Sequence, residues 1–512
     1  MTNDSGGGRP VESRGTSYDE ALTSSSIIGG TQAVVYLLSL FKTKIAAVLL
    51  GPSGVGLTAL YISATSLVAT VSGLGLNTSG VREVASAAST GDEGQIAQTV
   101  ALLKKLCWLT GLAGWLLTIL LAWPLSRWTF GDVEHVGAIA VLGSTVMLAA
   151  ISGGQAAVIQ GMRRIGDLAR VNFLCVAGGT AATLVIYALM GQRGIVSALI
   201  VSALITTYFN WSFSRRIRVE PVRLKWSEVF GGSRRLLHLG LATMWNALLI
   251  TGVALATRAL VVRDFGLDAA GVYQAAWAIS GLFSGFVLSA MAADYYPRLT
   301  GACAEDSAVN RLVNEQAEVG MLLALPGLAA SLVFAPLAVE LLYSSEFQGA
   351  VALLPWFIAG VFVQIASWPA GFVPLARGEG AVFAAAESII CLCQMALTVV
   401  LLKLYGLPGA GMAFLGAQLV HLALYFAFAR WRTGFLWTWE TVKIVLFALL
   451  FLGLSVAIFA VGGSWVSYLC GLLVVAAASL FSLRGVARRA APETKIGKLL
   501  ARLPFAERLL YS

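Results

Sequence analysis

Residues 41–56, FKTKIAAVLLGPSGVG, place two lysines in a long apolar segment that ends in a glycine-rich turn. A charge inside a membrane costs about 2.5 to 3.5 kcal/mol, so it usually faces a bundle interior and marks a functional site. A second stretch, TRALVVRDFGLDAAGVY, follows about 215 residues later. There Arg258 precedes Gly271 much as Lys44 precedes the glycine turn. We therefore expect a transporter built of two repeated halves, each with a cationic membrane span.

The composition is that of an integral membrane protein. Of the 512 residues, 58% are hydrophobic and 12% are charged, with a mean hydropathy of +0.81, whereas soluble domains carry about 25% charged residues. The net charge of +9 is scattered over short loops, which argues against nucleic-acid binding. The six cysteines have no metal-ligand or disulfide spacing, and no ATP-binding loop or nucleophile motif occurs. We expect no enzyme activity, cofactor or metal.

Apolar runs of the length that crosses a membrane follow one another along the chain, since about 20 helical residues span a hydrocarbon core about 30 Å thick. They predict an all-α, polytopic membrane protein with about fourteen transmembrane helices. The predicted spans are 26–50, 55–81, 103–124, 136–160, 171–190, 194–214, 240–262, 270–297, 319–343, 350–376, 381–403, 409–430, 442–461 and 465–484.

The repeat predicts the domain organisation. GQRGIVSA at 191–198 aligns with GLPGAGMA at 406–413, again 215 residues apart. Two bundles of six helices in the same orientation are parallel repeats, which bind substrate between the halves near the midplane. The predicted parts are a disordered cytoplasmic tail (1–25), an N-terminal six-helix bundle (26–214), a basic cytoplasmic linker (215–239), a C-terminal six-helix bundle (240–432), two appended transmembrane helices (433–485) and a basic cytoplasmic tail (486–512).

The loops predict the orientation. With both termini inside, most of the 35 lysines and arginines fall in cytoplasmic segments, as the positive-inside rule requires. We expect both termini in the cytoplasm.

Four short motifs resemble the bacterial O-antigen and enterobacterial common antigen flippases. They are GPSGVGL at 51–57, QGMR at 160–163, GVYQ at 271–274 and YPRL at 296–299, and the resemblance covers about residues 26–432. Those flippases belong to the multidrug/oligosaccharidyl-lipid/polysaccharide (MOP) exporter superfamily, so the resemblance implies a MATE-like fold. The predicted number of fourteen spans differs from the twelve of most antigen flippases. It is similar to the number in the lipid II flippases.

The resemblance also implies a function. Its members turn an undecaprenyl-pyrophosphate-linked oligosaccharide from the cytoplasmic to the periplasmic leaflet of the bacterial inner membrane. The expected partners are this lipid-linked substrate, membrane lipids, and the polysaccharide polymerase and chain-length proteins of the same pathway.

Four basic residues are candidates for the pyrophosphate site. Fixed cations lower the barrier for an anion that crosses a low-dielectric slab. Lys42 and Lys44 lie about 200° apart around a helix, so at most one of them faces a central cavity. We favour Lys44, mirrored by Arg258, and both occupy positions where the resembled flippases carry a basic residue. For Lys42 and for Arg263, which is near a helix end, the alternative is that the side chain snorkels to the membrane interface.

Three titratable residues in apolar runs are candidates for proton coupling or for ion pairing. They are Asp294, Glu387 and His421. A buried carboxylate is either paired or protonated, and a histidine titrates near neutral pH. The alternatives are a helix-end acid for Asp294 and a packing residue for His421. Candidates for a cytoplasmic gate are Arg82, Arg163, Arg298 and Arg377, although positive-inside sorting alone would also place them at helix ends.

Three other functions are alternatives to a flippase for lipid-linked oligosaccharides. A cation-coupled multidrug exporter of the same superfamily should have an acidic cavity, which Lys44 and Arg258 argue against. A lipid II type flippase is a second alternative, because the predicted number of spans is similar to that of the lipid II flippases. A membrane polysaccharide polymerase would need a large periplasmic loop, and the sequence has none.

Overall fold

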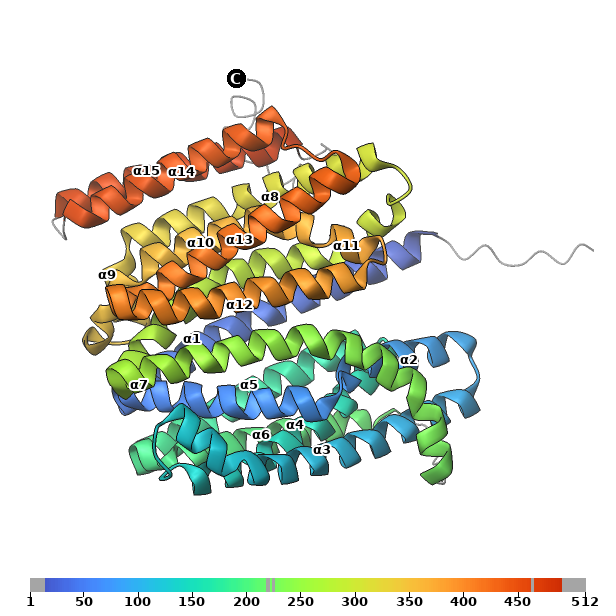
Figure 1. The fold of residues 1–512 in the computed structure, drawn as a ribbon. Coiled ribbons are helices and arrows are strands. Elements are labelled where there is room, and N and C mark those ends of the chain that lie inside the picture. Colours follow the sequence, from blue (N-terminus) through green and yellow to red (C-terminus); the bar gives the residue numbers. More distant parts are fainter. Residues whose placement is uncertain (1–13, 218–221, 223–225, 462–464, 490–512) are drawn as a thin grey trace, which may run out of the picture. The chain divides into compact units, whose positions relative to one another are not determined.

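The computed structural model describes residues 14–217, 222, 226–461 and 465–489, and every regular element in that part of the chain is a helix. In chain order (Figure 1) these are α1 (Arg14–Gly73), α2 (Leu76–Thr90), α3 (Glu93–Thr129), α4 (Val136–Gly161), α5 (Ile165–Met190), η1 (Gly191–Gly194), α6 (Ile195–Ser214), α7 (Trp226–Gly301), α8 (Asp306–Val333), α9 (Ala335–Leu342), η2 (Ser345–Ala352), α10 (Leu354–Gly371), α11 (Val373–Ala376), α12 (Gly380–Tyr405), α13 (Pro408–Thr433), α14 (Trp439–Val461) and α15 (Trp465–Arg489).

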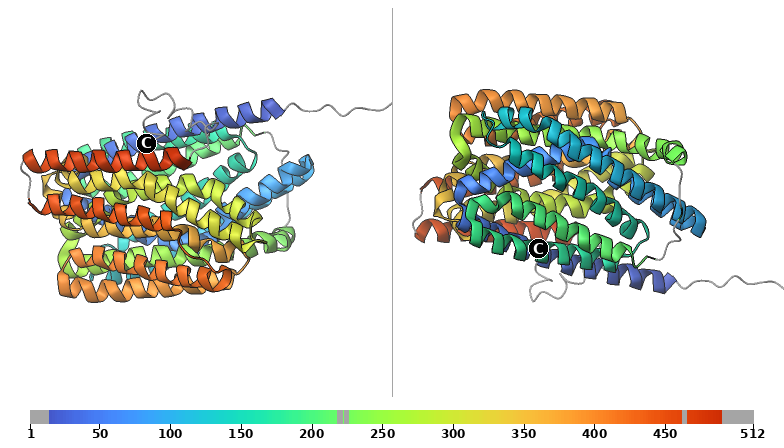
Figure 2. Two further views of the ribbon diagram at one scale, coloured as in Figure 1. Left: turned by 90° about the horizontal axis from the view of Figure 1, so that it is seen from above. Right: turned by 90° about the horizontal axis from the view of Figure 1, so that it is seen from below.

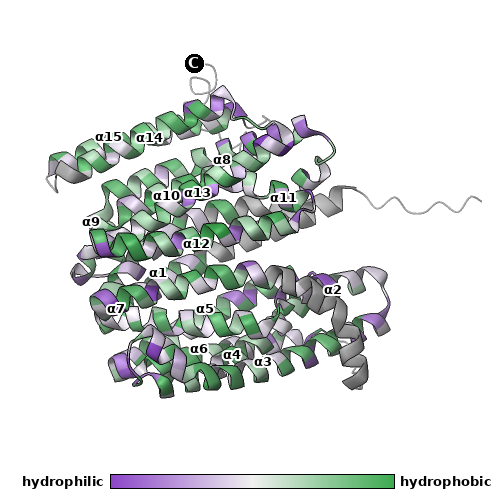
Figure 3. Cartoon of the chain, viewed as in Figure 1, coloured by the Kyte–Doolittle hydropathy of each residue, from purple (hydrophilic) through white to green (hydrophobic). Residues whose placement is uncertain are grey.

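The helices confirm an all-α, multi-pass membrane protein. Eleven helical segments in the described residues are long and apolar enough to cross a membrane, and apolar residues run along most of their length (Figure 3). Three of them, Val34–Gly73, Ile165–Ser214 and Met244–Leu282, have 39 to 50 residues. At 1.5 Å per residue these reach about 60 Å or more, twice the membrane core. Counting each as two spans would give fourteen, and that number stays a prediction.

Glycines at equivalent places divide two of these long helices. Gly51 in α1 has φ 65° and ψ −175°, and Gly266 in α7 has φ 86° and ψ 176°. Only glycine adopts such a conformation at low cost, so the chain changes direction there. The two glycines are 215 residues apart, the same offset as in the sequence motifs. The duplication is therefore visible in the backbone.

The segments after these kinks approach each other closely. A Cβ atom on Gly56 would lie 2.8 Å from the backbone nitrogen of Gly271, and one on Gly271 would overlap the carbonyl oxygen of Pro52. Glycine at both places lets two helix backbones come nearer than any side chain would permit.

Three predicted spans contain a break in the helix, although Leu354–Ala376 is still long and apolar enough to cross a membrane as one span. The span 55–81 is broken between α1 and α2, where Leu74 and Gly75 adopt positive φ. The span 319–343 is split between α8 and α9, and 350–376 is split between α10 and α11. Pro336 and Pro374 stand in the first turns of α9 and α11. Proline has no N–H for the preceding helix, so a new helix begins there.

The contacts divide the chain into two compact units. Unit 1 comprises Met1–Thr43, Val68–Leu121 and Gly137–Met244, and unit 2 comprises Lys44–Leu67, Ala122–Val136 and Trp245–Ser512. The core of unit 1 includes Leu103 and Ile159, both fully buried. The boundaries of the predicted bundles stay a prediction.

Unit 2 has the larger core. In this unit α13 packs on α10 and α12, and α8 packs on α10, α14 and α15. Figure 2 shows the same helices from two further sides. Leu325, Phe357 and Ile365 are among its fully buried side chains. The helices predicted as an appendage, α14 and α15, thus contribute to the packing of unit 2.

A polar cluster joins α8 to α14 and α15. Glu318, with 7% of its surface exposed, accepts hydrogen bonds from Arg489 Nε (2.7 Å) and Thr441 Oγ1 (2.6 Å). The Ser482 hydroxyl donates to the Leu322 carbonyl oxygen. A buried carboxylate costs several kcal/mol unless it is paired, so the cluster holds α15 against α8.

Candidate functional site

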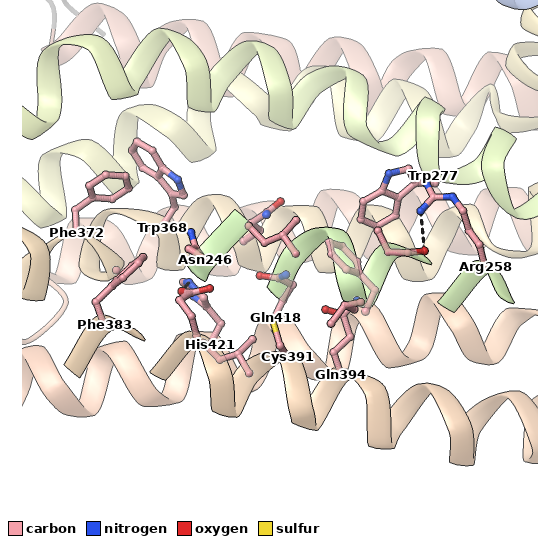
Figure 4. A pocket seen from close by; sticks show the side chains of 18 of the residues that line it. Asn246, Arg258, Trp277, Trp368, Phe372, Phe383, Cys391, Gln394, Gln418 and His421 are labelled. Carbon is pink, nitrogen blue, oxygen red and sulfur yellow. Dashed lines mark hydrogen bonds and ion pairs between the residues drawn. The ribbon is translucent and has the colours of Figure 1, made fainter. Parts of the chain in front are cut away.

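A cavity of about 360 Å³ lies within unit 2. Its lining comes from α7, α10, α12 and α13 (Figure 4), and combines aromatic rings, side-chain amides and a few ionisable groups. This is the composition of a ligand site, where an apolar wall carries a small number of polar groups.

Arg258 marks one end of this cavity. It belongs to α7 and only 8% of its surface is exposed. Its Nε and Nη2 donate to Oε1 of Gln274 (3.1 and 2.9 Å), and its Nη1 donates to the carbonyl oxygen of Ala254 (2.9 Å). The guanidinium carbon lies 5.8 Å from the ring centroid of Tyr273. Among the described residues Arg258 forms no ion pair, so a positive charge is buried beside the cavity without a neutralising carboxylate.

The kink at Gly266 brings Arg258 and Gln274 together. In a straight helix two residues sixteen positions apart would be about 24 Å apart along the axis. The reversal of α7 at the glycine places them side by side instead. The predicted link between a cation and the glycine turn therefore has a physical basis in the second half.

Glu387 and His421 both line the cavity and lie close to each other. The Tyr425 hydroxyl donates to Oε1 of Glu387 (2.8 Å), and His421 Nε2 lies 3.9 Å from the same oxygen. His421 Nδ1 and the Ser367 hydroxyl are 2.9 Å apart. Because His421 and Tyr425 are one turn apart on α13, they share the face that meets α12. Two of the three residues predicted for proton coupling thus form one group.

Asp294, the third of them, lies outside the residues whose side chains are described.

Lys44 has a different place from Arg258. Its Nζ donates to the carbonyl oxygens of Glu340 (2.8 Å) and Tyr343 (2.5 Å). Glu340 lies in the last turn of α9 and Tyr343 directly follows this helix. Carbonyl oxygens at a helix C-terminus have no donor within the helix, so a cation there gives them a hydrogen-bond donor and complements the helix dipole. Lys44 does not line the cavity in this conformation. The expected pairing of Lys44 with Arg258 at one anion site is therefore not seen in the described structure.

The other two candidate cations, Lys42 and Arg263, do not line the cavity. Lys42 is half-buried, and no hydrogen bond of its side chain is recorded in the described part of the chain. Arg263 is exposed, three residues before the kink in α7. Exposure of Arg263 agrees with snorkelling.

Three of the candidate gate residues, Arg163, Arg298 and Arg377, lie at helix ends. Arg82 lies in the middle of α2, because the helix predicted to end at residue 81 is broken at Leu74 and Gly75 and a new helix continues past this arginine. Arg82, Arg163 and Arg298 are exposed. Arg377, after α11, has a side chain only 16% exposed and pairs with Asp306 at the start of α8. Arg377 therefore joins two helices at one end of unit 2.

Sequence reasoning missed the amides of the cavity. Asn246, Gln364, Gln394 and Gln418 line it, and Gln274 holds Arg258. Their signal was available, because a glutamine or asparagine inside an apolar span needs a partner just as a charge does.

Replacing Lys44 by methionine tests whether this lysine stabilises the end of α9. Loss of two charge-assisted hydrogen bonds costs about 1.5 to 3 kcal/mol each at most, so we expect Lys44→Met to lower the thermal unfolding midpoint of the purified protein by several degrees. Lys44→Arg should keep most of the stability. Lys42→Met is the matched control and should leave the midpoint unchanged. Unaltered stability of Lys44→Met would show that the cap contributes nothing.

Comparisons with known proteins agree with this fold. The chain matches the profile of a polysaccharide biosynthesis protein family over residues 45–352. A lipid III flippase of Escherichia coli K12 is 22% identical over 395 residues, which are 76% of this chain and 93% of the relative.

Two solved structures are similar to the chain in fold. The lipid II flippase MurJ in an inward closed conformation has a TM-score of 0.65 at 14% identity, covering 90% of this chain and 99% of that structure. An inward-facing MATE transporter of the MOP superfamily has a TM-score of 0.60 at 18% identity, covering 78% and 94%.

These matches confirm the predicted MATE-like fold and the resemblance to flippases of the MOP superfamily. The relatives are flippases and transporters, in agreement with the expectation that the chain is not an enzyme. Because the family profile matches more than half of its length, the chain belongs to the polysaccharide biosynthesis protein family.

Proposed function

We propose that the chain is a flippase for an undecaprenyl-pyrophosphate-linked oligosaccharide, such as an O-antigen unit or a unit of another surface polysaccharide. It moves this lipid from the cytoplasmic to the periplasmic leaflet of the bacterial inner membrane by alternating access. The observation that carries the proposal is the buried guanidinium of Arg258 beside a cavity of about 360 Å³. The family and the lipid III and lipid II flippases similar to the chain support it.

The donors of Arg258 suit a phosphate group. A guanidinium has five N–H donors in a rigid fork that matches phosphate geometry. Three of them are used by Gln274 and Ala254. Two remain for a ligand, since no further partner is recorded among the described residues. A buried cation that lacks a protein carboxylate binds a pyrophosphate without first breaking an ion pair, and the low local dielectric strengthens the attraction.

The other predicted roles remain proposals. Glu387 with His421, and Asp294, are candidates for proton coupling, and the contact of 3.9 Å between Glu387 and His421 supports the first pair. The ion pair of Arg377 with Asp306 supports a gating role for Arg377, because such a pair can open as helices separate. Cytoplasmic termini rest on the distribution of lysine and arginine.

Lipid exchange in liposomes tests the function. We would reconstitute the purified protein with a fluorescent undecaprenyl-pyrophosphate-linked trisaccharide and measure its bleaching by a membrane-impermeant reductant. The reductant should reach lipid from both leaflets when the protein is present and from only the outer leaflet in empty liposomes. Parallel liposomes would hold lipid II, or a small cationic dye. Movement of the dye without movement of either lipid would contradict the proposal and indicate a multidrug exporter.

A further inference from the structure

The cavity contains hydrogen-bond acceptors that lack donors. Asn246 Oδ1 and Gln418 Oε1 are buried, and neither has a hydrogen-bond partner among the described residues. Only 8% of Gln418 is exposed. A buried polar atom without a partner has lost its hydrogen bonds to water and gained none in return, so such an atom calls for an explanation. Two of them in one cavity, whose lining also includes the carboxylate of Glu387, indicate a ligand rich in donors.

The aromatic lining adds a second property. Figure 4 shows Trp368, Phe372 and Phe383 at the end of the cavity away from Arg258, and His421, Gln418 and Gln394 between the two ends. Aromatic faces bind an apolar surface, while neighbouring amides bind polar edges. A sugar ring has this amphipathic character, with C–H groups on its faces and hydroxyl groups around its edge.

We propose that this part of the cavity binds the saccharide portion of the substrate and selects uncharged sugars over acidic ones. The inference rests on the proposed function, because it makes Arg258 the pyrophosphate end of the same elongated site. Sugar hydroxyls donate to Asn246 Oδ1, to Gln418 Oε1 and to the carboxylate of Glu387, and the ring stacks near Trp368.

The charges near these acceptors explain the selectivity. A uronic acid would bring a carboxylate toward Glu387, and this carboxylate has no proton to donate to the unpartnered oxygens of Asn246 and Gln418. Like charges at close range in a low-dielectric site repel each other strongly. Among the described lining residues the one arginine or lysine is Arg258, at the other end. An acidic sugar would therefore be disfavoured by repulsion from Glu387, and because its carboxylate leaves the unpartnered acceptors without a donor.

A bound metal cation is the main competing occupant, since it also takes oxygen ligands. In the described residues no cluster of three acidic, histidine or cysteine side chains could hold a metal. The aromatic wall and the extension of the cavity from Arg258 to Phe383 favour an organic ligand of greater length.

Binding of three soluble probes tests the inference. They are citronellyl pyrophosphate, its glucose conjugate and its glucuronic acid conjugate, titrated calorimetrically into the purified full-length protein in detergent. We expect the glucose conjugate to bind at least tenfold more tightly than either other probe. Gln418→Leu should remove that advantage and leave the affinity for citronellyl pyrophosphate unchanged. Asn246→Leu should also reduce the preference for the glucose conjugate. It replaces Gln418→Leu in the experiment if that variant does not fold.

The control is Gln155→Leu. Gln155 in α4 of unit 1 is also 8% exposed and has an Oε1 atom without a partner in the described residues, so it matches Gln418 in chemistry outside the cavity. This variant should retain the preference for glucose.

Two outcomes separate the inference from the function on which it rests. Sugar-independent binding that is lost in Arg258→Gln but unaffected by Gln418→Leu would overturn the saccharide site and leave the pyrophosphate site intact. No binding of citronellyl pyrophosphate to the wild type would contradict the proposed function itself. Stabilisation by sodium that Gln418→Leu removes, with no discrimination among sugars, would replace the inference by a cation site.

Discussion

Replacing Gly271 by alanine is expected to abolish most of the folded protein. The added Cβ atom would overlap the carbonyl oxygen of Pro52, and a backbone atom cannot move aside as a flexible side chain does. Overpacking of this kind costs about 3 kcal/mol or more, because the helix that follows the kink in α1 must shift. The measurement is the amount of monodisperse protein extracted from membranes, together with its thermal unfolding midpoint.

Gly252→Ala is the matched control for this change. Gly252 lies in the same helix, α7, and a Cβ atom there has no neighbour within 4 Å. Alanine is better than glycine in a helix by about 1 kcal/mol, so this variant should be as stable as the wild type or slightly more stable. Equal yields of the Gly271 and Gly252 variants would contradict the close crossing of α1 and α7.

Arg258→Gln is expected to reduce lipid exchange about 10- to 100-fold without reducing the amount of inserted protein. A charged hydrogen bond to the pyrophosphate contributes about 1.5 to 3 kcal/mol, and each 1.4 kcal/mol corresponds to a factor of ten. Removal of a charge from a membrane span does not hinder insertion. Arg258→Lys should retain part of the activity, because lysine keeps the charge but not the fork of donors. The measurement is exchange in liposomes, normalised to protein.

The control for Arg258 is Arg263→Gln, on the same helix. Arg263 is exposed and does not line the cavity, so its neutralisation should leave exchange unchanged. Wild-type exchange by Arg258→Gln, or an equal loss in Arg263→Gln, would remove Arg258 from the anion site.

The all-helical membrane architecture could be predicted from the sequence because its cause is local. A run of about 20 apolar residues must form a helix in lipid, where every backbone group needs an internal partner. The equivalence of the two halves was also predictable. Glycines such as Gly51 and Gly266 recur at one offset, since the backbone conformations that they permit are closed to other residues.

The partners of the buried polar groups could not be predicted, because they lie far away in the sequence. Glu318 belongs to α8, and its partner Arg489 stands 171 residues later, at the end of α15. No periodicity or composition links the two. Gln418 was overlooked for a related reason, since its amide is informative only once its neighbours are known.

Lys44 and Arg258 show most clearly which properties follow from the sequence and which depend on the tertiary structure. The sequence by itself determined that each half carries a cation in a membrane span near a glycine turn, because insertion cost and backbone freedom are properties of single residues. Only the tertiary structure decided what each cation contacts. Lys44 donates hydrogen bonds to carbonyl oxygens at the C-terminal end of α9, whereas Arg258 donates to Gln274 beside the cavity. A long, flexible side chain binds whichever acceptor the packing of distant helices brings within its reach, and that packing is a property of the whole fold.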